Sequence, residues 1–171
     1  MKKLIILFLL TITCLRISAQ DCKYVVNKFD RELNRLVETE EKRINKSFTS
    51  RYYFAMSFTI TNTLKTMGLK IVGGTSTLRV RDNDKLILTL NNNETITLYP
   101  LKEILSSTVS FSNLPSYSYA LPHYYLCDNY LDKISETGLK KISMYTSERL
   151  FESEVKEKDN KNIKQLIRCV K

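Results

Sequence analysis

Glycine, proline, histidine and tryptophan are all scarce in this chain, and each shortage excludes a class of protein. The 171 residues include four glycines, three prolines, one histidine and no tryptophan. Phosphate- and dinucleotide-binding loops depend on clustered glycines, and neither fingerprint occurs in the sequence. The low content of glycine and proline also excludes collagen-like and low-complexity chains. The remaining composition is that of an ordinary folded domain.

His123 is the only histidine, and its surroundings argue against catalysis. A zinc site needs three or four ligands at suitable spacing, and the sequence contains no such cluster, so we expect no metal and no cofactor. Cys127 follows four residues later, and on a helix the two side chains would meet as a nucleophile and its base. On the strand that we expect here, they would lie roughly 13 Å apart. The sequence therefore predicts no catalytic residue and favours a non-enzymatic protein.

The first 19 residues have the organisation of a secretory signal peptide. Lys2 and Lys3 precede an apolar run over residues 4–15, and Ser18-Ala19 offers a cleavage site of small residues. The apolar run is shorter than the roughly 20 residues that cross a bilayer, so we expect no transmembrane segment after cleavage. The alternatives are a retained anchor and a lipoprotein.

Cleavage after residue 19 predicts an exported protein, located in the periplasm, at the cell surface or in the medium. No Gly-, Ser- or Pro-rich linker interrupts the remainder, so residues 20–171 are expected to form a single α+β domain. Removal of residues 1–19 takes away three bases and no acid, which lowers the formal net charge of +9 by three. The remaining bases are spread among acids along the chain, so we expect no nucleic acid as a partner.

Three cysteines remain in the mature chain: Cys22, Cys127 and Cys169. An exported protein can hold a disulfide, but three cysteines allow three single pairings and leave one thiol over. Cys22 with Cys169 would close the longest loop, which the chain-entropy model favours most. We take this pair as the candidate disulfide, with three separate buried thiols as the alternative.

Residues 51–145 alternate between apolar and polar side chains, as strands do. In the first run, Phe54, Met56, Phe58 and Ile60 are expected to face inward, while Tyr53 and its alternates face the other way. Turns are expected at Gly73-Gly74 and at two tripeptides rich in Asn and Asp, residues 82–84 and 91–93. This pattern predicts an antiparallel meander.

Residues 104–127 contain no Lys, Arg, Asp or Glu and are rich in serine and tyrosine. Two strands are expected here, joined near residues 113–115. Charge depletion with tyrosine enrichment is typical of the centre of a recognition surface. The candidate binding residues are Tyr117, Tyr119, His123, Tyr124 and Tyr125. The alternative is that these side chains fill the interior of the sheet.

Two helices are expected near the C-terminus. Asp128 is expected to cap a short helix that contains Tyr130, Leu131 and Ile134 and that Gly138 ends. A strand follows over residues 139–145. The final helix is expected to begin at Thr146 or Ser147 and to present apolar residues on one side to the end of the chain. The apolar positions are Phe151, Val155, Ile163, Leu166, Ile167 and Val170. A one-sided apolar stripe needs a surface to cover, and the sheet is the largest one available.

Two short segments mark the ends of the mature chain: the run Tyr-Val-Val-Asn-Lys-Phe-Asp at residues 24–30, and Gly-Leu-Lys-Lys-Ile at residues 138–142, followed by a helix that ends at Cys169. In these segments the chain resembles small exported bacterial proteins of uncharacterised function. The resemblance implies an N-terminal strand pair, a meander and a closing helix, and no activity. Periodicity alone leaves residues 22–45 open between helix and strands, and the resemblance favours two strands.

These observations predict an α+β protein with an antiparallel sheet or flattened sandwich of about seven to nine strands, a short helix and a C-terminal helix packed on one face. We carry three hypotheses for function. The first is a non-enzymatic binding or accessory module of the cell envelope that contacts a protein or a glycan through its tyrosines. The second is an inhibitor-like or structural module without a small-molecule site. The third is a hydrolase of an unrecognised type.

Overall fold

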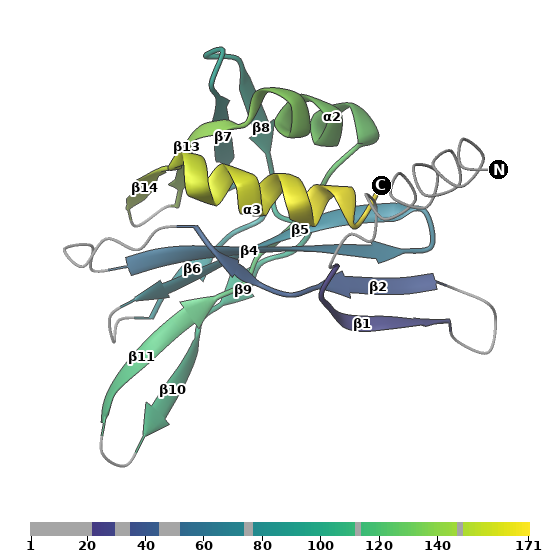
Figure 1. The fold of residues 1–171 in the computed structure, drawn as a ribbon. Coiled ribbons are helices and arrows are strands. Elements are labelled where there is room, and N and C mark those ends of the chain that lie inside the picture. Colours follow the sequence, from purple (N-terminus) through teal and green to yellow (C-terminus); the bar gives the residue numbers. More distant parts are fainter. Residues whose placement is uncertain (1–21, 30–34, 45–51, 74–76, 112–113, 147–148) are drawn as a thin grey trace, which may run out of the picture.

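The structure is a computed structural model that describes residues 22–29, 35–44, 52–73, 77–111, 114–146 and 149–171. The expected signal peptide, residues 1–19, and Gly74 of the expected turn lie outside this part of the chain. The described residues form three antiparallel sheets and two helices (Figure 1). The predicted α+β class is therefore confirmed, with the additional finding that the strands divide among three sheets.

The largest sheet has eight strands and begins and ends with exposed hairpins. Its members are β1 (Tyr24–Phe29), β2 (Arg35–Thr39), β3 (Lys42–Arg43), β4 (Tyr52–Thr61), β5 (Leu64–Gly73), β10 (Ser107–Phe111), β11 (Leu114–Ala120) and β12 (His123–Tyr125). The order across the sheet is β1-β2-β4-β5-β11-β10, with β3 paired to β4 and β12 paired to β5. The strand reading of residues 22–45 is confirmed by β1 and β2.

The hairpin of β4 and β5 forms the centre of this sheet. Its ten residue pairs run without interruption from Tyr52 opposite Gly73 to Thr61 opposite Leu64. Asn62 has φ of 58° in the turn, a left-handed conformation that asparagine tolerates. The four inward positions predicted in β4 are all buried. The sequence analysis missed this turn because it contains neither glycine nor proline.

A second sheet has four strands and lies on the same side of the large sheet as the helices (Figure 1). A third sheet has two short strands. The four-stranded sheet contains β7 (Leu86–Leu90), β8 (Thr95–Leu98), β13 (Leu139–Tyr145) and β14 (Leu150–Glu154) in the order β14-β13-β7-β8. The two-stranded sheet pairs β6 (Arg79–Val80) with β9 (Ile104–Leu105). The predicted turn at residues 91–93 joins β7 to β8, and Asn93 has φ of 67° there.

The two helices are α2 (Asp128–Thr137) and α3 (Glu157–Arg168). The short helix ends at Gly138 as predicted, and the φ of 82° at Gly138 is one that glycine adopts without strain. The predicted cap is wrong by one residue: the N-cap is Cys127, and Asp128 lies in the first turn of the helix. The start of the final helix was predicted wrongly: α3 begins at Glu157, not at Thr146 or Ser147.

Residues 150–154, which the apolar spacing predicted to be helical, form strand β14. Phe151 and Val155 are four residues apart, which suits one face of a helix, but residues 151, 153 and 155 are all buried while 150, 152 and 154 are exposed. This alternation has a period of two, and it pairs β14 with β13. The spacing of the two apolar residues fitted both periods, and pairing with β13 decided between them.

Helix α3 lies across one face of the eight-stranded sheet and separates it from α2 (Figure 1). Its apolar residues Ile163, Leu166, Ile167 and Val170 are buried against that face, which we call the inner face. The opposite face of the same sheet is called the outer face. A single hydrophobic core fills the space between the large sheet, α3 and the four-stranded sheet.

Three polar or covalent links hold α3 and the sheets in place. Asn160 is 8% exposed; its Nδ2 donates to the carbonyl oxygen of Leu139 at 2.7 Å, and its Oδ1 accepts from the N–H of Leu139 at 2.7 Å. Tyr52 Oη donates to the carbonyl of Glu152 and accepts from its N–H, which joins β4 to β14. A disulfide joins Cys22 to Cys169, the pair that closes the longest loop.

Candidate functional site

The outer face of the eight-stranded sheet carries a row of tyrosines contributed by strands that are far apart in the sequence. Residues directly opposite each other in antiparallel strands share a face. Tyr53 of β4 lies opposite Val72 of β5, and Val72 lies opposite Tyr119 of β11. Tyr117 is two residues before Tyr119 and faces the same side. We call Tyr53, Tyr117 and Tyr119 together the tyrosine face.

Cationic side chains lie over two of these rings. The guanidinium carbon of Arg43 is 3.8 Å from the centre of the Tyr53 ring, and the Nζ of Lys70 is 4.8 Å from that of Tyr119. Both distances are within the range of cation–π attraction. Lys70 also donates to Glu41 at 3.0 Å. These contacts fix the rings in place while leaving the tyrosines only partly buried.

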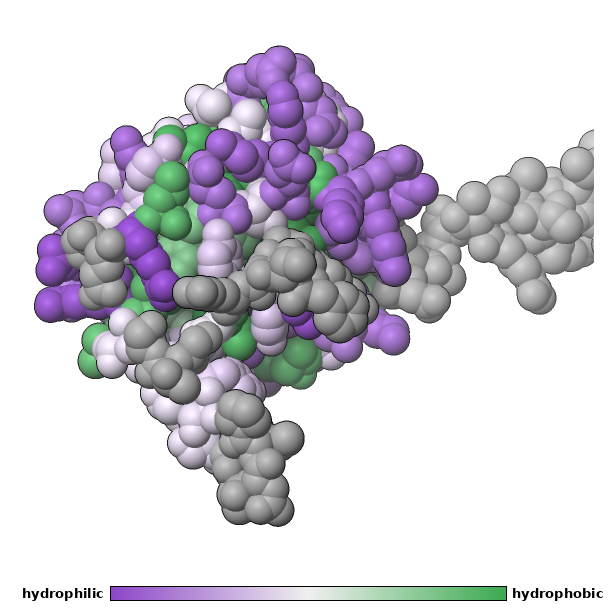
Figure 2. Space-filling model, turned by 90° about the vertical axis from the view of Figure 1, so that its left-hand side faces the viewer, coloured by the Kyte–Doolittle hydropathy of each residue, from purple (hydrophilic) through white to green (hydrophobic). Residues whose placement is uncertain are grey.

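The hairpin of β10 and β11 projects from the sheet and carries no charged residue (Figure 1). Figure 2 shows it as a pale protrusion, in contrast to the strongly hydrophilic surface above it. On the side of the hairpin away from the tyrosines, the hydroxyls of Thr108 and Ser118 are hydrogen-bonded at 3.1 Å, as are those of Ser110 and Ser116. The hairpin thus has one aromatic and one hydroxyl side.

The sheet register brings His123 and Tyr125 to the outer face as well. His123 lies opposite Gly68 and Tyr125 opposite Thr66, further along the same strand that carries Val72. Tyr125 is 50% exposed. Four of the five residues predicted from the sequence, Tyr117, Tyr119, His123 and Tyr125, therefore share one face of one sheet.

Tyr124 does not belong to this surface, and its inclusion among the binding residues is corrected here. It lies opposite Met67 on the inner face and is 1% exposed. Burial raises the pKa of its hydroxyl far above the usual range, and the charge of Asp84 adds to the effect. Adjacent residues on a strand point to opposite faces, so Tyr124 and Tyr125 could not both lie on one surface.

His123 is packed against a close approach of β4 and β5. A Cβ at Gly68 would lie 2.8 Å from Ser57 Oγ and 3.4 Å from His123 Cε1, so any larger residue there would have to displace the Ser57 hydroxyl. Burial lowers the pKa of His123, which the carboxylate of Glu38 partly opposes. Cys127 lies beyond the end of β12 at the N-cap of α2, so the two residues do not share a helical turn.

Acidification is expected to destabilise the protein through His123. Its folded-state pKa is lowered, so below the unfolded-state value of about 6.5 the unfolded chain binds more protons than the folded one. The stability that the neutral ring provides is complete above that value and is lost as the pH falls through the folded-state pKa. Urea unfolding at pH 7.5 and pH 5.5 measures the free energy of unfolding at both values. This free energy should fall more between pH 7.5 and pH 5.5 in the wild type than in His123→Gln. Equal decreases would contradict this assignment.

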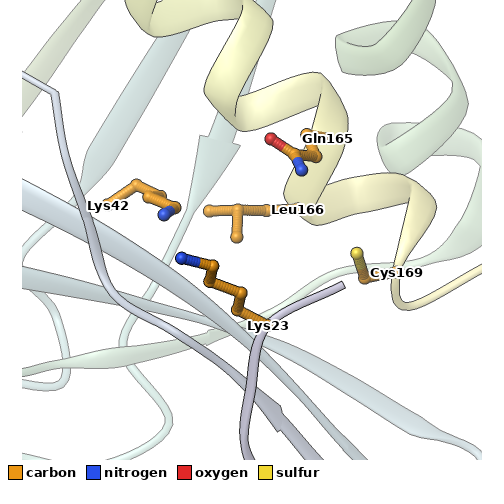
Figure 3. Close-up of a pocket in the computed structure, with 5 residues that line it drawn as sticks. All are labelled: Lys23, Lys42, Gln165, Leu166 and Cys169. Atoms are coloured by element: carbon orange, nitrogen blue, oxygen red, sulfur yellow. The ribbon is translucent and has the colours of Figure 1, made fainter. Parts of the chain in front are cut away.

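A second candidate site lies on the inner side of the sheet, between α3 and the first strands. A cavity of about 250 Å³ is lined by Lys23, Lys42, Gln165, Leu166 and Cys169 (Figure 3). A neighbouring cavity of about 390 Å³ shares Lys42 and adds Arg43, Lys156, Lys158, Asp159 and Asn162. We call the two cavities together the basic groove. The sequence analysis missed it because its lysines come from both ends of the chain.

Within the described residues, no three side chains of His, Cys, Asp or Glu come together in an arrangement that could hold a metal ion. In the same part of the chain, neither helix has the length and hydrophobicity that membrane crossing requires. Comparison of the chain with models of protein families, with curated proteins and with solved structures finds no match in any of the three.

Proposed function

We propose that the chain is an exported, non-enzymatic binding module of the cell envelope and that it contacts a protein partner through the tyrosine face. The observation that carries this proposal is the sheet register, which gathers Tyr53, Tyr117 and Tyr119 on one face beside an uncharged hairpin. Tyrosine-rich, charge-poor patches are typical of the centres of protein interfaces. The Cys22–Cys169 disulfide supports an oxidising compartment.

The edge of the sheet next to the tyrosine face favours a protein over a glycan. Strand β10 pairs only with β11 within the described residues, so its other edge offers backbone N–H and C=O groups to a partner. It has neither charge nor proline, the two devices that most often protect an edge; a register shift between Val109 and Phe111 is its only irregularity. An extended segment of a partner protein can pair with such an edge.

The other strands that end the two larger sheets are less open to pairing. Strand β1 carries Lys28, and β14 carries Glu152 and Glu154. Strand β8 has only four residues, and Glu94 beside it is ion-paired with Lys133 of α2. Charge and short length both discourage pairing with another chain. β10 is thus the edge best suited to accept a partner strand.

Two alternatives remain to be separated from this proposal. An inhibitor-like or structural module would have its tyrosines in the interior, whereas Tyr117 and Tyr119 are only partly buried and Tyr125 is exposed. A hydrolase would bring a base and a nucleophile within hydrogen-bond reach. His123 and Cys127 lie on different elements, which favours binding over catalysis.

Loss of the two hairpin tyrosines should abolish most of the affinity. A photo-reactive residue in place of Val109 should crosslink to a protein in the envelope, whose identity is then fixed by mass spectrometry. Titration with that purified protein should show a dissociation constant at least tenfold higher for Tyr117→Ser/Tyr119→Ser, because aromatic residues at an interface centre contribute most to affinity. The control Tyr145→Ser removes an exposed tyrosine from β13 in the four-stranded sheet and should change the dissociation constant less than about twofold.

Three results would count against the proposal. The first is equal crosslinking from position 97 on the exposed side of β8, and the second is the absence of any adduct from position 109. The third is unchanged affinity of the purified partner for the double variant. A glycan-array signal that depends on the same two tyrosines would assign the face to a glycan instead. Unfolding curves of both variants separate loss of binding from loss of folding.

A further inference from the structure

The basic groove follows one side of α3. The lining residues on the helix are 158, 159, 162, 165, 166 and 169, which recur at intervals of three to four residues. This spacing places them on a single face of the helix. At 1.5 Å per residue the lining extends roughly 15 Å from Lys158 to Cys169. Lys42 on β3 borders both cavities and stands at the middle of the groove.

Positive charge dominates this groove. Four lysines line it, and Asp159 is the only acidic residue among its lining residues; the four are Lys23, Lys42, Lys156 and Lys158. Arg43 also borders the larger cavity, but its guanidinium lies over the Tyr53 ring. Figure 3 shows the amines of Lys23 and Lys42 both pointing into the smaller cavity beside Leu166. Like charges directed into one cavity repel each other, and an anion between them removes that repulsion.

The positive charge of the groove affects the carboxylate of Glu40, which is bonded to one of the lining lysines. Its carboxylate accepts a hydrogen bond from Lys42 Nζ at 2.9 Å. That hydrogen bond and the charge of Lys42, followed by the weaker effect of Lys23, lower the pKa of Glu40. An ammonium group has three donors, so Lys42 can hold Glu40 and a ligand oxygen at the same time.

We propose that the basic groove binds an acidic ligand with at least two oxyanion groups, one between Lys23 and Lys42 and the next beside Lys156 and Lys158. The smaller cavity is below the usual size of a site for a drug-sized molecule and suits a single anionic group. The neighbouring cavity, lined by Lys156 and Lys158, has room for a second anionic group further along the same ligand. Phosphate and carboxylate groups share this chemistry. The groove lies on the other side of the sheet from the tyrosine face, and the two share only Arg43, which neither test substitutes, so failure of either proposal leaves the other standing.

Calorimetric titration at low salt with inorganic tripolyphosphate, citrate and orthophosphate tests the proposal. Tripolyphosphate or citrate should bind more tightly than orthophosphate, because only they carry several linked anionic groups, and the tighter of the two identifies the chemistry. Lys23→Met/Lys42→Met should raise the dissociation constant of that ligand about tenfold, which is the effect expected for loss of a hydrogen bond to a charged group. Glu40→Gln should lower the dissociation constant of the same ligand about two- to fivefold, because this change removes a surface carboxylate that competes for Lys42.

Lys28→Met is the control for Lys23→Met and Lys42→Met measured singly. It removes the same single charge from an exposed lysine on β1, on the outer face, and should change the affinity less than about twofold. An equal loss in Lys28→Met would show non-specific attraction and would overturn the site, as would orthophosphate binding as tightly as the multivalent anions. Intact mass under non-reducing conditions verifies that Cys22–Cys169 has formed in every variant.

Discussion

Replacement of both Cys22 and Cys169 by serine is expected to lower the free energy of unfolding by about 2–5 kcal/mol. The disulfide closes a loop with a sequence separation of 147 residues, so its removal gives the unfolded chain a large gain in freedom. The hydrogen bond in which Tyr24 Oη donates to the backbone carbonyl of residue 169 at 3.2 Å keeps its acceptor in this variant, so the change tests the covalent link itself. Urea unfolding followed by circular dichroism measures the difference.

The experiment is best done in a Cys127→Ser background, because Cys127 is a free thiol that could exchange with the pair. Serine is a good N-cap residue, so this background retains α2. A reducing agent should destabilise the protein with the disulfide by a similar amount and leave the Cys22→Ser/Cys169→Ser protein unchanged. Equal stability of all forms would mean that the covalent link adds nothing to the packing of α3.

Asn160→Leu is expected to lower the free energy of unfolding by about 2–4 kcal/mol. Leucine has the same branched skeleton as asparagine, with bulkier methyl groups, but cannot bond to the backbone of Leu139, whose N–H and C=O would then be buried without partners. Chemical denaturation gives the size of the loss. Hydrogen exchange of the Leu139 amide should rise specifically in this variant, which distinguishes the lost bond from general loosening.

Two variants of the same helix complete the test. Asn160→Asp keeps the acceptor for the Leu139 N–H and loses the donor to its carbonyl, so it should also destabilise the protein. Asn162→Leu makes the same chemical change at a partly exposed position and should alter stability by no more than about 0.5 kcal/mol. A loss at position 162 equal to that at position 160 would refute the role of the Leu139 bonds.

The meander could be predicted from the sequence because its signals are local. Alternating side chains identify each strand, and the asparagine turn at residues 91–93 joins neighbours in the chain. The boundary of α3 could not be predicted in this way. Phe151 and Val155 satisfy a helical period, and only the pairing of β14 with β13 places Phe151 in a strand that ends one residue before Val155. Tertiary pairing overrode the local pattern.

The sequence could predict the individual residues of the tyrosine face but not that they lie together. The charge-free segment identified Tyr117 and Tyr119, and the alternation in β4 gave the facing of Tyr53. What joins them is the pairing of β5 with β11, across more than forty residues of intervening chain. No local signal encodes that register. Tyr124 could have been assigned to the interior, because its neighbour Tyr125 must face the other way.

The link between Cys22 and Cys169 makes almost the whole described domain a closed covalent ring. A protease that cuts one exposed loop opens this ring but detaches nothing, since both new ends remain in the same molecule. The projecting hairpin of β10 and β11 would thus stay attached to the domain after a single nick elsewhere. Release of a fragment requires a second cut or reduction of the disulfide.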